Sequence, residues 1–343
     1  MNICHDISLL QYNTFGIDVH ANTLISYESN EELVDIVLNH LPNLPKPLLH
    51  IGGGSNLLFM NDFKGTILLS EIKIVEVVTE TEDSVIIRAG SGLVLDEFIS
   101  YTLSQGWYGL ENLSLIPGQV GASAVQNVGA YGVEAGDRIV AVNCISLLDG
   151  SEKRFSHDEC NYSYRHSIFK ESHLYGKYAV VSVEYALSKT FIPQLNYGGI
   201  MHFLTSFGFT LEGVSAIQLR DIIISIRREK LPDPKVIGNA GSFFMNPIVD
   251  ISLLEKIRTQ YPEVPHYPTS HGKVKIPAAW LIDKCGWKGK SLGKASVHSR
   301  QPLVLINNGY ATGNDIKSLS DRIQQDVFDK FSISICPEVN FIY

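Results

Sequence analysis

Ser242 lies in GNAGSFFMNP (238–247), where small residues before the serine allow a ligand to approach the backbone closely. Such a serine could act as a nucleophile, a phosphate ligand or a proton donor, or it could only form a turn. The nucleophile hypothesis is weak, because the residues around Ser242 do not form G-x-S-x-G and no nearby histidine offers a base. No phosphate-loop motif lies nearby, and the residues alone leave the proton donor and the turn as open alternatives.

Two glycine-rich stretches have the composition of a cofactor site. The first, GGGSN (52–56), follows an apolar strand, and its small residues can present backbone N–H groups to a phosphate. It is not the Rossmann fingerprint, because the third glycine would fall at Leu57. The second, GLENLSLIPGQVGASAVQNVGAYG (109–132), is long and carries few charges. Together the stretches fit a large, phosphate-bearing cofactor, and the alternatives are a tight turn and a buried irregular loop.

The strands and helices that must position these residues follow one pattern up to about residue 190 and another after it. Residues 1–190 predict a mixed α/β region with many glycine turns. Strand patterns occur twice within 46–59, at the start of 84–107, and over 137–150 and 178–187. Helix patterns occur over 31–41, at the end of 84–107, over 215–230 behind a Ser215 N-cap, and over 251–261, 277–286 and 315–331. The final segment, 332–343, alternates as a strand and places Glu338 on its less apolar face.

The composition limits the class of protein. A chain of 343 residues with 45% apolar and 19% charged residues predicts two or three domains, each with a core. The net charge of −8 gives no general affinity for nucleic acid or anionic membranes, so an anionic substrate needs a local basic pocket. Five scattered cysteines, no zinc motif, no signal peptide and no apolar run near 18 residues predict a soluble cytoplasmic protein without a metal.

Seven motifs in register carry a resemblance to a known family. They are NTFGI (13–17), IGGGSNLL (51–58), the glycine stretch 109–132, YSYRHSIFK (162–170), KLPDPKVIGNAGSFFMNP (230–247), AAWLID (278–283) and PEVNFI (337–342). In this order they resemble the UDP-N-acetylenolpyruvoylglucosamine reductase (MurB) family, type I, over nearly the whole chain.

The resemblance implies an α+β fold of two parts. A two-part FAD-binding domain of the vanillyl-alcohol oxidase and p-cresol methylhydroxylase type would comprise 1–70 and 71–210, and a C-terminal α/β substrate-binding domain 211–343. The last strand could pack back on the first subdomain. FAD would be bound non-covalently, NADPH would reduce it, and a UDP-sugar would be the substrate of a monomer that binds neither nucleic acid nor membrane.

The resemblance also implies a catalytic set of three residues. Arg165 would bind a carboxylate whose charge grows during the reaction. Glu338 would polarise the enolic form by hydrogen bonding, either protonated or paired with a cation. Ser242 would give its proton to a carbanionic carbon, which is a strong enough base to take a proton from a weak acid.

The remaining site residues are implied in the same way. The residues that match the family's FAD site are Gly52, Gly53, Gly54, Ser55, Asn56, Leu57, Ile116, Pro117, Gly118, Gly121, Ala122, Gln126, Asn127, Gly129, Ala130, Tyr131, Gly132 and Arg227, the last near the flavin pyrimidine. The residues that match contacts to the UDP-sugar are Tyr164, Tyr197, Lys230, Asn246, Lys288 and Gln301. Tyr197 lies in NYGG, a loop typical of type I members that could close over the diphosphate.

One departure from the family pattern lies beside the serine. Many type I members have FFKNP where this chain has FFMNP, so Met245 removes a cation. Affinity for the diphosphate or for the NADPH phosphate could fall, unless another lysine compensates. Two other classes of protein remain as alternatives: an FAD-dependent oxidase of the same fold with a different substrate, and a non-catalytic UDP-sugar binding protein.

Overall fold

The computed structural model describes residues 1–195, 200–206, 213–269 and 272–343. The chain forms two compact units, and each contains segments that are distant in the sequence. Unit 1 comprises Met1–Ile7, Ala21–Gly53 and Lys64–Arg227, and unit 2 comprises Ser8–His20, Gly54–Phe63 and Arg228–Tyr343.

A four-stranded sheet begins unit 1. Its order is β1 (Asn2–Ser8), β2 (His20–Tyr27), β5 (Phe63–Ser70) and β3 (Leu48–Ile51). Helix α1 (Asn30–Asp35) begins at Ser29, whose side chain accepts the backbone N–H of Glu32. Helical turns continue over 36–40, so the helix predicted over 31–41 is confirmed. Its apolar side packs with the sheet around Ile25, Tyr27 and Leu68.

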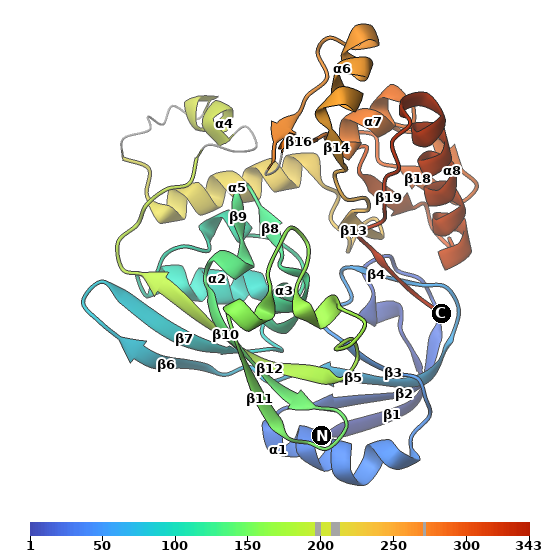
Figure 1. The fold of residues 1–343 in the computed structure, drawn as a ribbon. Coiled ribbons are helices and arrows are strands. Elements are labelled where there is room, and N and C mark those ends of the chain that lie inside the picture. The colour runs from blue at the N-terminus through green and yellow to red at the C-terminus, as the bar shows by residue number, and fades with distance from the viewer. Residues whose placement is uncertain (196–199, 207–212, 270–271) are drawn as a thin grey trace. The chain divides into compact units, whose positions relative to one another are not determined.

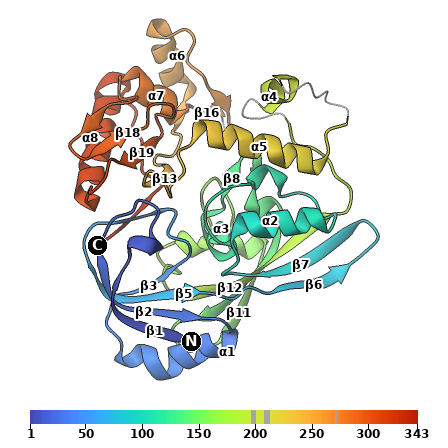
Figure 2. The same cartoon turned by 180° about the vertical axis from the view of Figure 1, so that it is seen from behind.

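A five-stranded antiparallel sheet forms the larger part of unit 1 (Figure 1). Its order is β11 (Glu152–Ser156), β10 (Ile139–Ser146), β12 (Tyr178–Ser188), β7 (Ser84–Gly90) and β6 (Val75–Glu80). Helices α2 (Leu95–Ser104) and α3 (Val120–Gln126) cover one face, as both views show (Figures 1 and 2). Side chains such as Phe98, Val120 and Tyr185 form the core between these helices and the sheet. Because Val120 belongs to the second glycine stretch, this packing holds that stretch against the sheet.

In the part of the chain that the structure describes, unit 1 also has two short strands and two α-helices, the second of which crosses the boundary to unit 2 after Arg227. They are the short strands β8 (Gly129–Ala130) and β9 (Val133–Glu134), and the helices α4 (Ile200–Ser206) and α5 (Ala216–Lys230). The Ser215 hydroxyl accepts the backbone N–H of Gln218 at 3.2 Å, so the predicted N-cap of α5 is confirmed.

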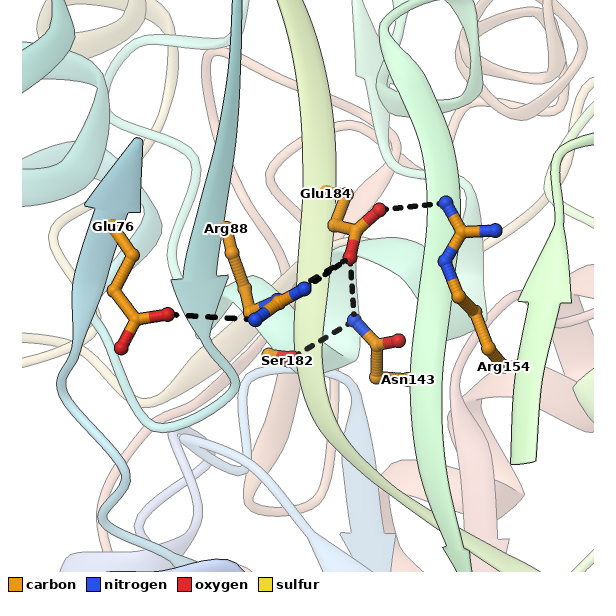
Figure 3. Close-up of polar contacts among 6 residues, drawn as sticks. All are labelled: Glu76, Arg88, Asn143, Arg154, Ser182 and Glu184. Atoms are coloured by element: carbon orange, nitrogen blue, oxygen red, sulfur yellow. Dashed lines mark hydrogen bonds and ion pairs between the residues drawn. The ribbon is translucent and has the colours of Figure 1, made fainter. Parts of the chain in front are cut away.

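A charged ladder crosses the five-stranded sheet (Figure 3). Glu184 is almost fully buried, and its carboxylate accepts from Arg88 at 2.9 Å and from Arg154 at 2.7 Å. Asn143 donates to the same carboxylate at 3.2 Å, and Glu76 pairs with the outer side of Arg88. Burial alone would raise the pKa of Glu184, but the two arginines and Asn143 hold it below its usual value.

Replacing Glu184 with glutamine is expected to lower the free energy of unfolding by about 1–3 kcal/mol, because two guanidinium groups lose their shared anion. The pKa of Glu184 is lowered in the folded state, so its stabilisation is present above the ordinary carboxyl pKa and fades as the pH falls through the folded value. Urea unfolding at pH 7 and at pH 4 measures this loss. Glu76→Gln, at an exposed position, should change stability by at most about 0.5 kcal/mol. A cost of Glu184→Gln that did not shrink on acidification would contradict the ion-pair explanation.

In its described residues, unit 2 has three sheets and, after the end of α5, three α-helices. The main sheet has the order β13 (Asn239–Ser242), β19 (Val304–Asn307), β18 (Ala295–Val297) and β17 (Ser291–Leu292). A second has the order β14 (Ile248–Asp250), β16 (Lys273–Lys275) and β15 (Tyr267–Pro268), and β4 (Leu57–Phe59) pairs in parallel with β20 (Asn340–Ile342). The helices are α6 (Ile251–Gln260), α7 (Ala278–Lys284) and α8 (Gly313–Phe331). Among the described residues no helix is long and apolar enough to cross a membrane.

The strand predicted over 332–343 is wrong for most of its length. Only Asn340–Ile342 forms a strand. Ser332 has a left-handed conformation that ends α8, and Pro337 has no N–H for a regular ladder. Residues 333–339 therefore lie outside the regular strands, and the backbone N–H of Glu338 donates to the Phe243 carbonyl.

Candidate active site

The two glycine stretches lie against each other in unit 1. A Cβ on Gly52 would lie 3.1 Å from the Cβ of Ala122, and a Cβ on Gly53 would lie 3.6 Å from the Cα of Gly118. Residues that are more than 60 positions apart in the sequence thus form one region of small side chains. Such a region fits a flat, phosphate-bearing group, because backbone N–H groups can approach it without a side chain in between.

Gly54 makes the sharpest turn of the first stretch. Its φ is +64°, and a Cβ would lie 1.9 Å from the carbonyl oxygen of Tyr12, so only glycine fits. Asn56, two residues later, is hydrogen-bonded to the C-terminal segment. Its side chain donates to the Glu338 carbonyl at 3.1 Å, and its carbonyl accepts the N–H of Asn340 at 3.0 Å. The GGGSN turn therefore also fixes the segment that carries Glu338.

Gly54→Ala is expected to lower the free energy of unfolding by at least about 2 kcal/mol, since it adds a steric clash to an unfavourable φ. Gly16→Ala is a matched control in the same unit, because Gly16 has the same φ of +64° and nothing within 4 Å of its Cβ position. It should lose only the backbone term of about 1–2 kcal/mol. Urea unfolding compares the two, and equal losses would show that the approach of Tyr12 does not matter.

The second glycine stretch is held by the turn that precedes α2. Val120 N–H donates to the Leu93 carbonyl at 2.9 Å, and Gly121 N–H donates to the Ser91 carbonyl at 3.0 Å. A Cβ on Gly121 would lie 2.7 Å from the Cβ of Ser91, which excludes larger residues. The start of α3 is thus fixed against its neighbour before any ligand binds.

Asn127 ends α3 in a left-handed conformation and is 1% exposed. Its amide donates to Glu134 at 2.7 Å and to the Ser163 carbonyl at 2.9 Å, and it accepts Gly136 N–H at 2.8 Å. The family resemblance implies that Asn127 is a cofactor contact. In the structure its side chain holds the loop that brings YSYRHSIFK to the 129–132 segment.

Arg165 also lies beside that segment in unit 1. Its φ is +56°, and its Nη2 donates to the Gly129 carbonyl at 2.8 Å. Its guanidinium also lies over the ring of Tyr164, at 5.3 Å from the centroid. Lys170 Nζ donates to the Arg165 carbonyl and to the Gln126 side chain, both at 2.9 Å. Lys170 was missed by the sequence reasoning, although it closes the YSYRHSIFK motif.

Ser242 is the last residue of β13 in unit 2 and is exposed. Gly241 before it has a φ of +68°, and its N–H donates to the side chain of Asn239 at 2.9 Å. The Asn239 amide donates in turn to the carbonyls of Ile237 at 2.8 Å and Pro232 at 3.3 Å. The buried Asn239, another residue that the sequence reasoning missed, therefore sets the turn that presents Ser242.

The segment that carries Glu338 runs alongside the residues after Ser242. Glu338 N–H donates to the Phe243 carbonyl at 2.8 Å, and Met245 N–H donates to the Cys336 carbonyl at 2.9 Å. Unit 2 thus brings Ser242 and Glu338 onto neighbouring segments, although they are far apart in the sequence. Arg165 belongs to unit 1.

The NTFGI motif supports the serine strand. The ring centroids of Phe15 and Phe243 are 6.2 Å apart, and a Cβ on Gly238 would lie 2.1 Å from the Phe15 carbonyl oxygen. Asn307 donates to the same carbonyl at 3.0 Å, and its N–H donates to the Gly238 carbonyl. The motif is therefore structural, and it fixes the start of the stretch that ends in Ser242.

The residues expected to contact the UDP-sugar have varied surroundings. The Asn246 side chain accepts the N–H of Ala278 at 2.9 Å and so caps α7, and Gln301 accepts the N–H of Leu303 at 3.4 Å. Lys230 ends α5, and both Lys230 and Lys288 are exposed. Tyr197 lies outside the described residues.

Comparison with known proteins gives the family. Residues 22–156 match the model of an FAD binding domain, which includes both glycine stretches, and residues 233–342 match the C-terminal domain of UDP-N-acetylenolpyruvoylglucosamine reductase. The reductase of Bacteroides fragilis is 51% identical over 335 residues, covering 98% of each chain. The chain belongs to the UDP-N-acetylenolpyruvoylglucosamine reductase family.

Further comparisons agree with the family. The reductase of Porphyromonas gingivalis is 42% identical and covers 100% of each chain. The solved reductase from Thermus caldophilus has a TM-score of 0.69 at 21% identity, with 100% of each chain covered, which supports the fold. The predicted fold class, an FAD-binding domain followed by the family's C-terminal domain, is confirmed. The chain is an FAD-dependent oxidoreductase.

Proposed function

We propose that this chain reduces UDP-N-acetylglucosamine enolpyruvate to UDP-N-acetylmuramate with NADPH as the reductant, a cytoplasmic step of peptidoglycan synthesis. Its family membership supports the reaction. The structural observation that carries the proposal is the pairing of the Ser242 and Glu338 segments through the Phe243 carbonyl. A proton donor and a carboxyl group on neighbouring segments suit the protonation of an enolic intermediate.

Bound FAD would supply the hydride that it has received from NADPH. The chain's own residues have other tasks. The small residues at Gly52, Gly53, Gly118 and Ala122 would hold the cofactor, because they leave space beside the backbone. The loop around Gly129, which Arg165 holds by a hydrogen bond, would complete this site.

Arg165 would bind the substrate carboxylate, whose negative charge grows as the neighbouring carbon becomes carbanionic. Its Nη2 donates to the Gly129 carbonyl, so the guanidinium is oriented before the substrate arrives. Glu338 would polarise the enolic form through a hydrogen bond. Ser242 Oγ would give its proton to the carbanionic carbon, and water would restore that proton later.

Substrate recognition would use residues that precede and residues that follow Ser242 in the sequence. Lys230 and Lys288 would bind the diphosphate, and Tyr164, Asn246 and Gln301 would position the uridine and the sugar. Tyr197 would close over the diphosphate as a lid. The FAD-binding subdomains would be 1–70 and 71–210, the substrate domain 211–343, and the protein a monomer.

Anaerobic titration tests the proposed reaction. NADPH should bleach the flavin absorption of the purified protein, and the enolpyruvyl UDP-sugar should then restore it without oxygen. The UDP-sugar product should form in equal amount to the NADPH consumed. Reoxidation by oxygen alone, with no response to the substrate, would favour a different FAD-dependent oxidase, and a protein that stays colourless after FAD is added would favour a binding protein.

A further inference from the structure

Asp96 holds a strained residue, Leu115, within the second glycine stretch. Leu115 has a φ of +58°, a conformation that costs a residue with a Cβ about 1–2 kcal/mol. Its N–H donates to the Asp96 carboxylate at 2.6 Å, from the first turn of α2. A charge-assisted bond of this kind can offset the unfavourable backbone conformation.

The carbonyl of the same residue is held by a cation from α5. Arg227 Nε donates to the Leu115 carbonyl at 3.2 Å, and its guanidinium contacts the Tyr131 hydroxyl. Arg220, about two helical turns earlier on α5, forms a two-point ion pair with Asp96 at 2.6 and 3.0 Å. One carboxylate and two guanidinium groups therefore fix both polar groups of one peptide residue; we name them the Asp96 clamp.

The charges of the clamp are set by its members. Burial alone would raise the pKa of Asp96, but Arg220, the Leu115 N–H and Arg227 together hold it below its usual value. Burial lowers the pKa of the Arg227 guanidinium below its usual value, and Tyr131 and Asp96 offset only part of this lowering. The Arg220 side chain is 14% exposed and that of Asp96 24%, so the pair is weakly screened by solvent.

The clamp lies next to the region where the two glycine stretches meet. Leu115 is followed by 116–118, and Gly118 approaches Gly53 and accepts the N–H of Leu95, the neighbour of Asp96. We propose that Asp96 is a positioning residue for the flavin: through Leu115 and Arg227 it sets the 116–118 turn and the Arg227 guanidinium before FAD binds. This inference rests on the proposed FAD contacts of that turn and of Arg227.

Flavin affinity tests the inference without a measurement of turnover. Asp96→Asn keeps an acceptor for the Leu115 N–H but loses the charge that pairs with Arg220. The Kd of FAD, measured by the quenching of flavin fluorescence, should rise by about 10- to 100-fold, because the turn and Arg227 are no longer fixed before binding. Arg220→Gln, which removes the partner and leaves Asp96, should shift the Kd in the same direction.

Arg88→Gln is the matched control, because it breaks an ion pair to a buried carboxylate in the same unit, in the ladder of Figure 3. It should leave the Kd of FAD unchanged. An unchanged Kd in both clamp variants, or an equal rise in the control, would overturn the inference. If Asp96→Asn does not fold, Arg220→Gln alone decides. A wild-type chain that binds no FAD would instead contradict the proposed function. If both clamp variants keep the wild-type Kd and the substrate still reoxidises their reduced flavin, this inference fails and the proposed function stands.

Discussion

Ser242→Ala is expected to lower kcat by at least about 100-fold with little change in KM, because the carbanionic carbon would lose the proton donor that we propose for it. Ser242 is exposed at the end of β13, and the turn before it is fixed by Asn239, so the substitution removes only an oxygen. The substrate should still bind, and it should still reoxidise the reduced flavin at some rate. Steady-state NADPH oxidation and direct measurement of the product check the result.

A serine elsewhere in unit 2 provides the control for this substitution. Ser291 lies on β17 and its hydroxyl contacts Ser296 at 2.6 Å. Ser291→Ala should keep normal turnover. If Ser242→Ala also turned over at a rate near that of the wild type, the proton would come from another group, and the proposed role of Ser242 would be wrong.

Arg165→Ala is expected to lower kcat/KM by about 100-fold or more, because it removes the cation that would bind the developing negative charge. Arg165→Lys should fall between the wild type and the alanine variant. A lysine keeps the charge, but it cannot bind a carboxylate with the planar fork of an arginine while also donating to the Gly129 carbonyl. Kinetics with varied substrate measure the three proteins.

The control for Arg165 is an arginine outside the proposed site. Arg154→Lys keeps the charge next to Glu184 on the five-stranded sheet and should leave kcat/KM unchanged. An Arg165→Ala protein with the turnover of the wild type would remove Arg165 from the proposed mechanism. Equal rates for Arg165→Lys and the wild type would show that charge alone, without the fork, is sufficient.

Most helices were predicted from the sequence because their signals are local, whereas α3, which lies inside the second glycine stretch, and α4 were not predicted. The Ser215 hydroxyl and the apolar positions after it are enough to place the start of α5. The end of the chain was predicted poorly, since its alternation favours a long strand and only contacts with distant segments limit it. Cys336 and Glu338 bond to the 243–245 segment instead of continuing a ladder, and a single sequence does not contain that pairing.

The supporting residues of the site were missed for the same reason. Asn307 donates to Phe15 across 292 residues, and Lys170 acts on carbonyl and amide oxygens. Every residue has a backbone carbonyl oxygen, so a side chain that bonds to such an oxygen leaves no recognisable pattern in the sequence. Leu115 is similar, because nothing in its residue type indicates a left-handed conformation. The small residues, in contrast, indicated the region where Gly52 and Ala122 meet.

Met245 illustrates how the structure limits the effect of a departure from a family pattern. Its N–H donates to the Cys336 carbonyl, a backbone bond that does not depend on the side chain. A methionine in place of the lysine that the resemblance implies therefore preserves the backbone pairing of the Ser242 and Glu338 segments. The consequence that we expect is confined to affinity for a phosphate group.

The composition of unit 2 from three separate segments has a consequence for how the chain folds. A fragment that begins at Arg228 would lack 8–20 and 54–63, so it would expose Phe243 where Phe15 packs and leave β20 without β4. Contacts that join residues so far apart close large loops late, which slows folding. We therefore expect that a fragment of residues 228–343 would not fold to the structure of unit 2 on its own, and that unit 2 can assemble only after the last residues of the chain have been synthesised.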